Sequence, residues 1–454
     1  MEKYVLWAAM ITSFMGAFVG SGINVAVPAI GQEFSADAGS LSRVVSSYLF
    51  GSAMLTMPMG RLADICGRKK IYTIGAALFG FSLFMAGIAI SIEMLTAVRF
   101  CQGLILSMIF GPGMALLVSV FDPSERGRVI GLSTAAVYVG LTCGPAISGF
   151  ICHFLGWRMY FFLSGIMSLL SLWLVLKIKG EWYGDRTASF DYKGSACFMV
   201  AAPLMLYGLS NLSNQDGRWM LIAGLIGMLL FVKLELGSKY PMLNLNLFRS
   251  NREFTCSNLA SMLHYGATYA VSFLMSLYLQ LVCGLDAPEA GMIILVQSLV
   301  MAVVAPRAGS ISDHIRPGKV ASAGMAVNAL GLIFLSMLDG SISIYVIIAL
   351  LMWIGFGSGL FSSPNNNAIM GSVDKKYYGT ATSVLSTMRI FGQATSMAVV
   401  TFIMDVNQVR VATGLDNIEL LNAVKISFGV FAVLCLTGVA MSLARNRGNA
   451  ETSL

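Results

Sequence analysis

The chain has 454 residues, of which 57% are hydrophobic and only 11% carry a charge. This composition excludes an ordinary soluble domain and indicates an integral membrane protein. The net charge of +7 is accounted for by loop residues and is no argument for nucleic-acid binding.

A membrane-spanning helix needs roughly 20 consecutive apolar residues. The first apolar stretch follows directly on Met1-Glu2-Lys3 and is too long for the apolar core of a signal peptide, so it is interpreted as the first span. The sequence predicts an all-α integral membrane protein with 14 transmembrane helices. They are expected near residues 5–28, 42–60, 71–91, 94–118, 129–152, 160–178, 194–213, 218–236, 254–282, 289–306, 320–338, 343–364, 380–404 and 424–444.

Lys and Arg are distributed unevenly between the loops on the two sides of the membrane. With the N-terminus inside, 22 of the 29 basic residues lie in inner segments, five lie outside, and two, Arg99 and Arg389, fall within spans. Because inner loops of membrane proteins are enriched in Lys and Arg, both termini are expected in the cytoplasm. The expected location is the plasma membrane, which is the inner membrane of a cell with two.

The eight cysteines are scattered, mostly within spans, without C-x-x-C pairs or histidine clusters. Neither a disulfide framework, a metal site nor a cofactor is expected. No nucleophile–base pair or phosphate-binding loop is present in the sequence, so the chain is not expected to be an enzyme. The expected partners are a small-molecule substrate, protons and the lipid bilayer, with no nucleic acid, and the protein is expected to be a monomer.

Two stretches of the chain resemble each other weakly. Gly60 is followed four residues later by Asp64 and then by a basic turn, and Gly309 is followed in the same way by Asp313. Parallel repeats of this kind are typical of transporters with two six-helix bundles and a substrate between them. The predicted divisions are an N-terminal bundle over 1–178, a linker with two extra helices and a cytoplasmic connector over 179–253, and a C-terminal bundle over 254–454.

Several motifs follow one another in an order that resembles a known family. The segment Gly60 to Lys70 matches the pattern G-x-L-A-D-x-x-G-R-K, and Arg99 to Gly103 matches R-x-x-Q-G. The segment Gly140 to Gly149 resembles G-x-x-x-G-P-x-x-G-G, with Ser148 in place of one glycine. Further similar positions are Trp157-Arg158, Phe190 to Gly194, Pro241, Leu247 to Arg249, Tyr278 to Gln280, Gly284 and Ala290-Gly291.

The ordered series resembles the major facilitator superfamily, in its fourteen-span drug:proton antiporter branch of the multidrug efflux type. The resemblance implies an alternating-access carrier, that is, a secondary active transporter that exports small amphipathic compounds in exchange for protons. It also implies a conformational latch in the loop between spans two and three. The latch residues are Gly60, Asp64, Gly67 and Arg68, with Asp313 in the second repeat.

The latch has a physical basis, because a carboxylate there can bond helix N-termini while a guanidinium bridges to another helix. The alternative is a solvated turn that only orients the protein. In span five, Gly140, Gly144 and Gly149 allow close helix contact and Pro145 allows a bend. Antiporter behaviour is what the resemblance implies for this helix, and simple helix packing is the alternative.

Arg99 and Arg389 are expected in the substrate cavity, since a cation near mid-bilayer costs at least roughly 2.5–3.5 kcal/mol unless it faces water or a partner. For Arg99 the alternative is a structural clamp on backbone carbonyls. The other expected cavity residues are Asn24, Tyr138, His264, Tyr265 and Gln297. Two residues are candidates for proton coupling: His264, because an imidazole titrates near neutral pH, and Glu33. A neutral, hydrogen-bonded interior histidine is the alternative for His264.

The sequence departs from the branch at one informative position. Val19 stands five residues before Asn24, where the branch usually has an aspartate that exchanges a proton and attracts cationic drugs. The remaining acids nearest the spans, Glu33, Asp37, Asp64, Glu235 and Asp405, are all expected near water. A cavity with arginine and no fixed acid favours anionic groups. The alternative function is therefore a carrier or facilitator for an anionic or amphipathic metabolite or lipid, without the usual proton coupling.

Overall fold

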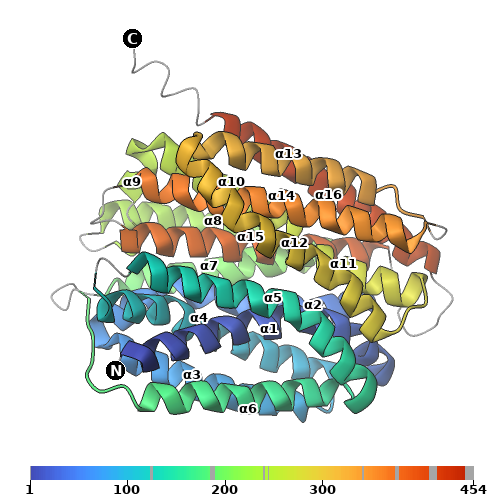
Figure 1. Ribbon diagram of the computed structural model, residues 1–454, viewed down its shortest axis with the longest axis horizontal. Helices are drawn as coiled ribbons and strands as arrows, with labels where there is room; N and C mark the ends of the chain where they lie inside the picture. Colours follow the sequence, from blue (N-terminus) through green and yellow to red (C-terminus); the bar gives the residue numbers. More distant parts are fainter. Residues whose placement is uncertain are drawn as a thin grey trace.

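The computed structural model describes residues 2–122, 126–184, 190–238, 241–243, 245–339, 342–373, 378–407, 409 and 417–444. Every regular element among these residues is a helix, and the long helices run roughly along one common axis (Figure 1).

The first six helices pack on one another and are called the N bundle. Helix α1 lies against α5 and α6, α2 lies against α4, and α3 lies against α4 and α6. Their bounds are α1 Glu2–Phe34, α2 Ala38–Cys66, α3 Arg68–Gly87, α4 Ile92–Val120, α5 Arg126–Leu155 and α6 Trp157–Leu176.

Two helices follow that pair mainly with each other: α7 (Tyr192–Ser210) and α8 (Gln215–Gly237). Helix α7 also packs against α2 of the N bundle and against α15 of the later helices. The short helix α9 (Leu245–Ser250) lies in the segment predicted as a connector. The linker pair is thus in contact with both halves of the molecule.

The remaining helices form the C bundle. Their bounds are α10 Arg252–Thr268, α11 Val271–Leu277, the π-helical turn η1 Tyr278–Val282, α12 Ala287–His314, α13 Pro317–Leu335, α14 Ile344–Gly371, α15 Tyr378–Val406 and α16 Asn417–Ala444. The span predicted over 254–282 is present as one stretch of membrane-spanning length, Arg252–Val282, with a local break between α10 and α11. At this break the Ala270 N–H donates to the Ser396 hydroxyl oxygen (3.2 Å), which replaces a bond inside the helix.

Eleven of the described helices are long and apolar enough to cross a membrane, fewer than the fourteen expected. Helices α2, α7 and α15 are not among the eleven. For α2 and α15 the reason is their position between other helices, where they bury hydroxyl groups such as those of Ser42, Ser52 and Thr401. A helix enclosed by other helices can satisfy such groups and need not be apolar on every side.

The faces of several helices that point away from the bundles carry large apolar side chains. Phe81 of α3, Trp173 of α6 and Leu229 of α8 are all more than half exposed. Such a surface is costly in water and suits the acyl chains of a bilayer.

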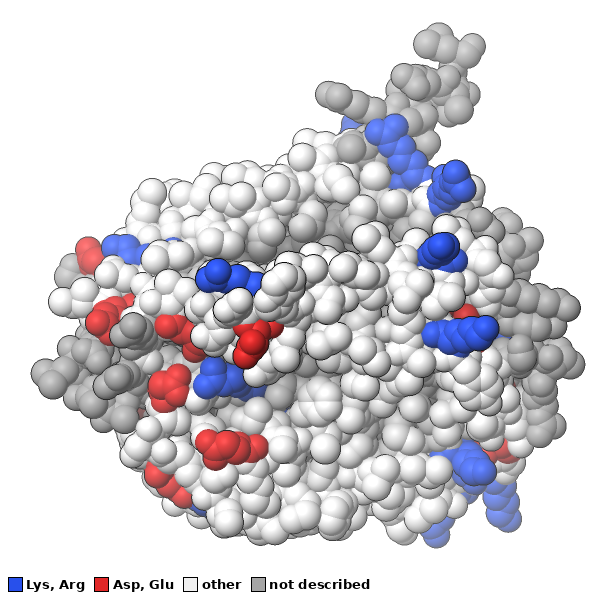
Figure 2. All heavy atoms as spheres, turned by 180° about the vertical axis from the view of Figure 1, so that it is seen from behind, with Lys and Arg blue, Asp and Glu red and all other residues white. Residues whose placement is uncertain are grey.

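Charge divides the molecule into two ends, which Figure 2 shows from behind. Lys and Arg gather at the end that holds the N-terminus, here called the basic end, and Asp and Glu gather at the opposite, acidic end (Figure 2). The helix directions place Glu33, Asp37, Glu93, Asp216, Asp286, Glu289, Asp339 and Asp405 at the acidic end. The predicted orientation rests on the uneven distribution of Lys and Arg between the loops of the two sides, and the structure shows the same uneven distribution in space.

Candidate functional site

The two bundles meet along α1 and α11 in the half of the molecule toward the acidic end. The Asn24 side-chain amide donates to the Ser272 hydroxyl (2.8 Å), and the Ser276 hydroxyl donates to the Asn24 carbonyl oxygen (2.6 Å). The Gln280 amide donates to the Val25 carbonyl (3.3 Å). Asn24, expected in the cavity, therefore joins the bundles, while its buried Oδ1 has no hydrogen-bond partner among the described residues.

Helices α5 and α12 meet through glycines. A Cβ atom at Gly291 would lie 2.5 Å from the Pro145 carbonyl oxygen, and one at Gly149 would lie 2.5 Å from the Ala287 carbonyl oxygen. No side chain fits at either position without moving the backbone of the other bundle. Gly140 and Gly144 face α1 instead, so the predicted glycine face of α5 serves close packing on two sides.

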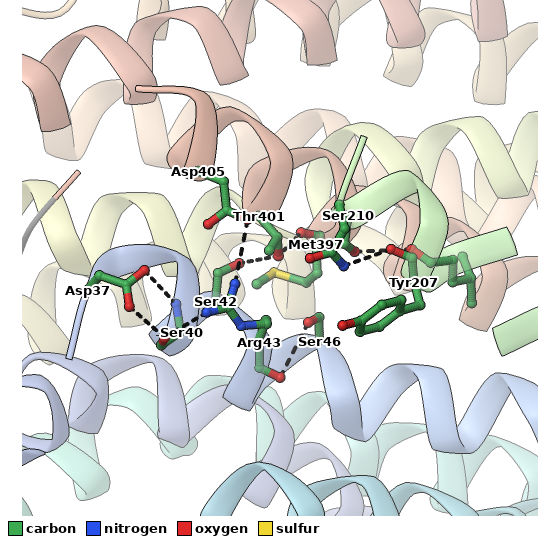
Figure 3. A network of polar contacts seen from close by, with 12 residues as sticks. Asp37, Ser40, Ser42, Arg43, Ser46, Tyr207, Ser210, Met397, Thr401 and Asp405 are labelled. Atoms are coloured by element: carbon green, nitrogen blue, oxygen red, sulfur yellow. Dashed lines mark hydrogen bonds and ion pairs between the residues drawn. The ribbon is translucent and has the colours of Figure 1, made fainter. Parts of the chain in front are cut away.

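A third contact joins α2 to α15 and is drawn in Figure 3. The Ser42 and Thr401 hydroxyls are 2.6 Å apart, and Arg43 Nη1 donates to Asp405 Oδ2 (3.5 Å) (Figure 3). On the same side, Asp37 caps α2 by accepting the Ser40 N–H (3.2 Å). Sequence analysis did not single out these pairs, because nothing local in either helix shows which residues face each other across 359 positions.

These three contacts are together called the acidic-end seam: Asn24, Ser42, Arg43, Gly149, Ser272, Ser276, Gly291, Thr401 and Asp405. A deeper bond between the bundles joins Tyr138 of α5 to Ser362 of α14, whose hydroxyl oxygens are 3.1 Å apart.

Arg99 is fully buried in α4. Its Nη1 donates to Gln102 Oε1 (2.9 Å), and its guanidinium carbon lies 4.2 Å from the centre of the Tyr48 ring. The Nε and Nη2 atoms have no hydrogen-bond partner among the described residues, and the guanidinium forms no ion pair among them. Tyr269 of the C bundle lies near enough to interact with Arg99 electrostatically. The cation therefore lies close to the interface of the two bundles, held by an aromatic face and an amide.

A second polar and aromatic group gathers from α5, α10, α14 and α15. Tyr138 and Arg389 both lie close enough to interact electrostatically with the hydroxyl of Tyr265. The buried His264 ring stacks on Phe361 with centroids 4.0 Å apart, and its Nδ1 atom has no hydrogen-bond partner among the described residues. Four of the expected cavity residues thus come together here.

Gln297 and Val19, which the sequence also singled out, both have buried side-chain atoms. Gln297 of α12 has a buried Oε1 without a hydrogen-bond partner among the described residues. Val19 is fully buried in α1, so the position where the related branch has an acid is an interior one.

At the basic end, Arg68 connects three helices. Its guanidinium donates to Asp64 Oδ1 (2.8 Å from Nε), to the Ala115 carbonyl oxygen (3.3 Å from Nη1) and to the Ser119 hydroxyl. The guanidinium bridge expected from the sequence is therefore present, from α3 to α2 and α4. The side chain of Asp313, the corresponding acid of the second repeat, lies outside the described residues.

The N-terminus of α3 is capped by Glu181 and not by Asp64. Glu181 accepts the backbone N–H groups of Lys69 (2.8 Å) and Lys70 (3.1 Å). Gly67 turns the chain with φ of +113°, a conformation that favours glycine, and a Cβ there would lie 2.7 Å from the Glu181 carboxyl carbon. Residues 60–70 and 181–184 together are called the basic-end loop. Glu181 follows α6, and no motif in the sequence indicated its role.

The Glu33 carboxylate at the end of α1 is held by two side chains of α6. Glu33 accepts hydrogen bonds from Arg158 Nη1 (2.6 Å) and Trp157 Nε1 (2.7 Å), so its carboxylate ties α1 to α6 within the N bundle.

Glu235, in the last turn of α8, is only 3% exposed. The expectation that Glu235 lies near water was wrong, because the segment 241–243 folds back over the end of α8 and its Leu243 N–H bonds Glu235 (3.0 Å).

The sequence matches the family description "Major Facilitator Superfamily" over residues 9–397 and again over 257–452. The chain belongs to this superfamily. It is therefore a multi-pass membrane transporter, consistent with the plasma membrane.

Two proteins of similar sequence align with most of this chain. The riboflavin transporter RibZ of Clostridioides difficile (strain 630) is 28% identical over 391 residues, which cover 84% of this chain and 85% of the relative. The multidrug resistance protein Stp of Mycobacterium tuberculosis (strain CDC 1551 / Oshkosh) is 31% identical over 385 residues, covering 83% of this chain and 71% of the relative.

Among solved structures, the fold is similar to that of a bacterial homolog of the human lysosomal transporter Spinster, described as inward-facing and unoccupied. The TM-score is 0.69 with 15% sequence identity, and the alignment covers 98% of this chain and 97% of the other. At this identity the likeness shows the shared fold.

Proposed function

We propose that the protein exports small amphipathic compounds by alternating access and prefers neutral or anionic polar groups to cations. The observation that carries this proposal is the surroundings of Arg99, a buried guanidinium near the bundle interface that is held by the Tyr48 ring and the Gln102 amide. A region whose fixed charge is positive attracts carboxylate or phosphate groups. Val19 supplies no acid to offset that charge.

Aromatic side chains near the two arginines support the amphipathic part of the proposal. Tyr48 lies beside Arg99, while Tyr265 lies beside Arg389 in the group that also holds His264 and Phe361. Ring faces of this kind bind flat apolar groups, and the hydroxyls fix their polar edges. The names of the relatives, a riboflavin transporter and a multidrug resistance protein, point to small organic substrates.

The direction of transport rests on the orientation proposed from the loop charges. If the basic end faces the cytoplasm, the acidic-end seam closes the outer side of the protein, and the inner side is the side from which substrate is proposed to enter. The solved relative of similar fold is described as inward-facing. Export then begins with substrate entering from the basic end.

Proton exchange is part of the proposal, and His264 is the first candidate for the proton carrier. Its imidazole lies in the interior, and its Nδ1 atom has no hydrogen-bond partner among the described residues. Glu33 is the lesser candidate, since Arg158 and Trp157 already bond its carboxylate. The second candidate function is a facilitator without proton coupling, which the valine at position 19 favours.

The test is transport by purified protein in liposomes, with an amphipathic anion and a lipophilic cation of similar size. The anion is expected to cross faster, and Arg99→Ala is expected to lower its rate at least about tenfold, since a charge-assisted hydrogen bond contributes roughly 1.5–3 kcal/mol. Arg218→Ala is the matched control, because among the described residues the Arg218 side chain bonds only loop carbonyls at the acidic end. If the Arg99→Ala variant inserts correctly into the liposome membrane and still transports the anion at the wild-type rate, Arg99 has no role in transport.

A reciprocal variant tests the role of the missing acid. Val19→Asp places a carboxylate at the interior position where the branch usually has one, and is expected to add efflux of the lipophilic cation. Absence of any gain in a correctly inserted variant would mean that the missing acid alone does not exclude cations.

A further inference from the structure

Two carboxyl groups meet where α7 begins and α8 ends. Asp191 is the N-cap of α7, and its Oδ1 accepts the Gly194 N–H (2.9 Å). Glu235 lies in the last turn of α8, is 3% exposed, and accepts the Leu243 N–H through Oε2 (3.0 Å). Each carboxyl group therefore uses one oxygen to hold backbone.

The second oxygen of each group is buried and has no hydrogen-bond partner among the described residues: Asp191 Oδ2 and Glu235 Oε1. Both face one small space beside Gly194, because a Cβ atom built on that glycine would lie 2.7 Å from each oxygen. The two oxygens are thus separated by no more than twice this distance. Gly194, which has no side chain, leaves the space between them open.

Two ionised carboxylates in this position would repel each other and leave two buried acceptors without a donor. Basic residues on the elements packed around the pair form no ion pair with either carboxyl group among the described residues: Lys193, Lys233, Arg249 and, on α2 and α15, Arg61 and Arg389. Of these, Lys193, Lys233 and Arg249 are exposed. The other charged residue toward this end of α2, Asp64, is itself an acid.

A divalent metal ion does not suit the space. Calcium and magnesium take six or more oxygen ligands, and no group of three or more His, Cys, Asp or Glu side chains able to hold a metal occurs in the described part of the chain. A proton needs only the two oxygens that are present, or those two and a water.

We propose that Asp191 and Glu235 form a binding site for one proton in the linker between the bundles. The proton resides on Glu235 Oε1 and is donated to Asp191 Oδ2, directly or through one water, so that the pair carries a single negative charge. Asp191 keeps that charge because it caps the positive end of the α7 dipole. The site joins α7 to α8 and to the segment 241–243, while α7 lies against α2 and α15. This proton site does not depend on which substrate the protein transports.

Infrared spectroscopy of the purified full-length protein tests this site, because a protonated carboxyl group has a C=O stretching band that an ionised one lacks. Near neutral pH the wild type is expected to show such a band, and Glu235→Gln is expected to lose it. Asp191→Asn is expected to lose it too, since the asparagine Oδ1 still caps α7 and its amide can donate to an ionised Glu235. Glu181→Gln is the matched control and should leave the band unchanged, because that carboxylate already accepts backbone N–H groups.

Each other outcome overturns the proposal. If the band survives in Glu235→Gln, the proton is elsewhere in the protein. If it is lost there but survives in Asp191→Asn, Glu235 holds a proton alone and the pair does not share one. If the wild type shows no band and sodium or potassium raises its thermal midpoint in a manner that Glu235→Gln abolishes, the site binds a metal cation. If Glu235→Gln does not fold, the Asp191→Asn spectrum alone decides between loss and survival of the band.

Discussion

The acidic-end seam and the basic-end loop use the same kinds of residues to join different parts of the molecule. At the seam, Gly291 fits against the backbone of the opposite bundle, and Arg43 reaches Asp405 across the interface. In the basic-end loop, Gly67 fits against Glu181 and Arg68 bonds Asp64, so these contacts stay within the N bundle and the segment that leaves it.

This difference indicates which contacts a transport cycle has to break. A carrier that rocks two bundles must separate one set of contacts between them while each bundle stays intact. The contacts of the acidic-end seam are of the first type, and those of the basic-end loop are of the second. We therefore expect changes at the seam to shift the balance of conformations, and changes in the loop to lower the stability of the N bundle.

The largest effect is expected from Gly291→Leu. The leucine Cβ would lie 2.5 Å from the Pro145 carbonyl oxygen, so the seam cannot close without displacement of α5 or α12. Overpacking of this kind costs about 1–3 kcal/mol, which corresponds to a change of roughly 5- to 150-fold in the ratio of closed to open seam. The distance between spin labels at the acidic ends of α2 and α15 should lengthen.

Gly429→Leu is the matched control for the seam, because no atom of the described residues lies within 4 Å of a Cβ built at that glycine. It should leave the label distance as in the wild type. An unchanged distance in Gly291→Leu would show that the seam tolerates a side chain and does not govern closure.

An intermediate effect is expected from Gly67→Ala in the basic-end loop. Alanine at φ of +113° is strained and its Cβ would meet the Glu181 carboxyl group, which together costs about 1–3 kcal/mol. The thermal midpoint of the purified protein should fall while the label distance across the seam stays the same. Gly60 lies within a helix, and no atom of the described residues is within 4 Å of a Cβ added there, so Gly60→Ala should be neutral or slightly stabilising. Equal midpoints for the two variants would refute the role given to Gly67.

The smallest effect is expected from Arg43→Gln. The pair with Asp405 spans 3.5 Å and its side chains are 35% and 19% exposed, so it contributes only about 0–1 kcal/mol to closure. The label distance distribution should shift slightly toward the open seam, and high salt should produce the same shift in the wild type. A shift as large as that of Gly291→Leu would mean that charge rather than packing holds the seam closed.

Local patterns predicted much of the N bundle. The small-residue face of α5 and the bridge made by Arg68 follow from residues within one helix turn or one loop, and both are present. Pairs such as Ser42 with Thr401 could not be predicted, because they depend on how two bundles dock and each residue alone resembles any buried hydroxyl.

Two features of the structure could not be predicted for a similar reason. Glu235 was expected near water because it ends an apolar stretch, but the segment 241–243 covers it. The span predicted over 254–282 is present as the helical stretch Arg252–Val282, but the sequence did not indicate its local break, where the Ser396 hydroxyl of another helix accepts the Ala270 N–H. In both cases a distant segment supplies the partner, and the local sequence carries no sign of it.

The most direct test of the proposed transport uses the wild type and Arg99→Ala in liposomes that contain a pH-sensitive dye, with an imposed proton gradient. The amphipathic anion and the lipophilic cation are added in turn, and substrate flux and internal pH are recorded together. We predict that the anion drives proton movement more strongly than the cation and that Arg99→Ala abolishes both flux and proton movement. Flux of substrate at constant internal pH would contradict proton exchange, and a preference for the cation would contradict the role proposed for Arg99.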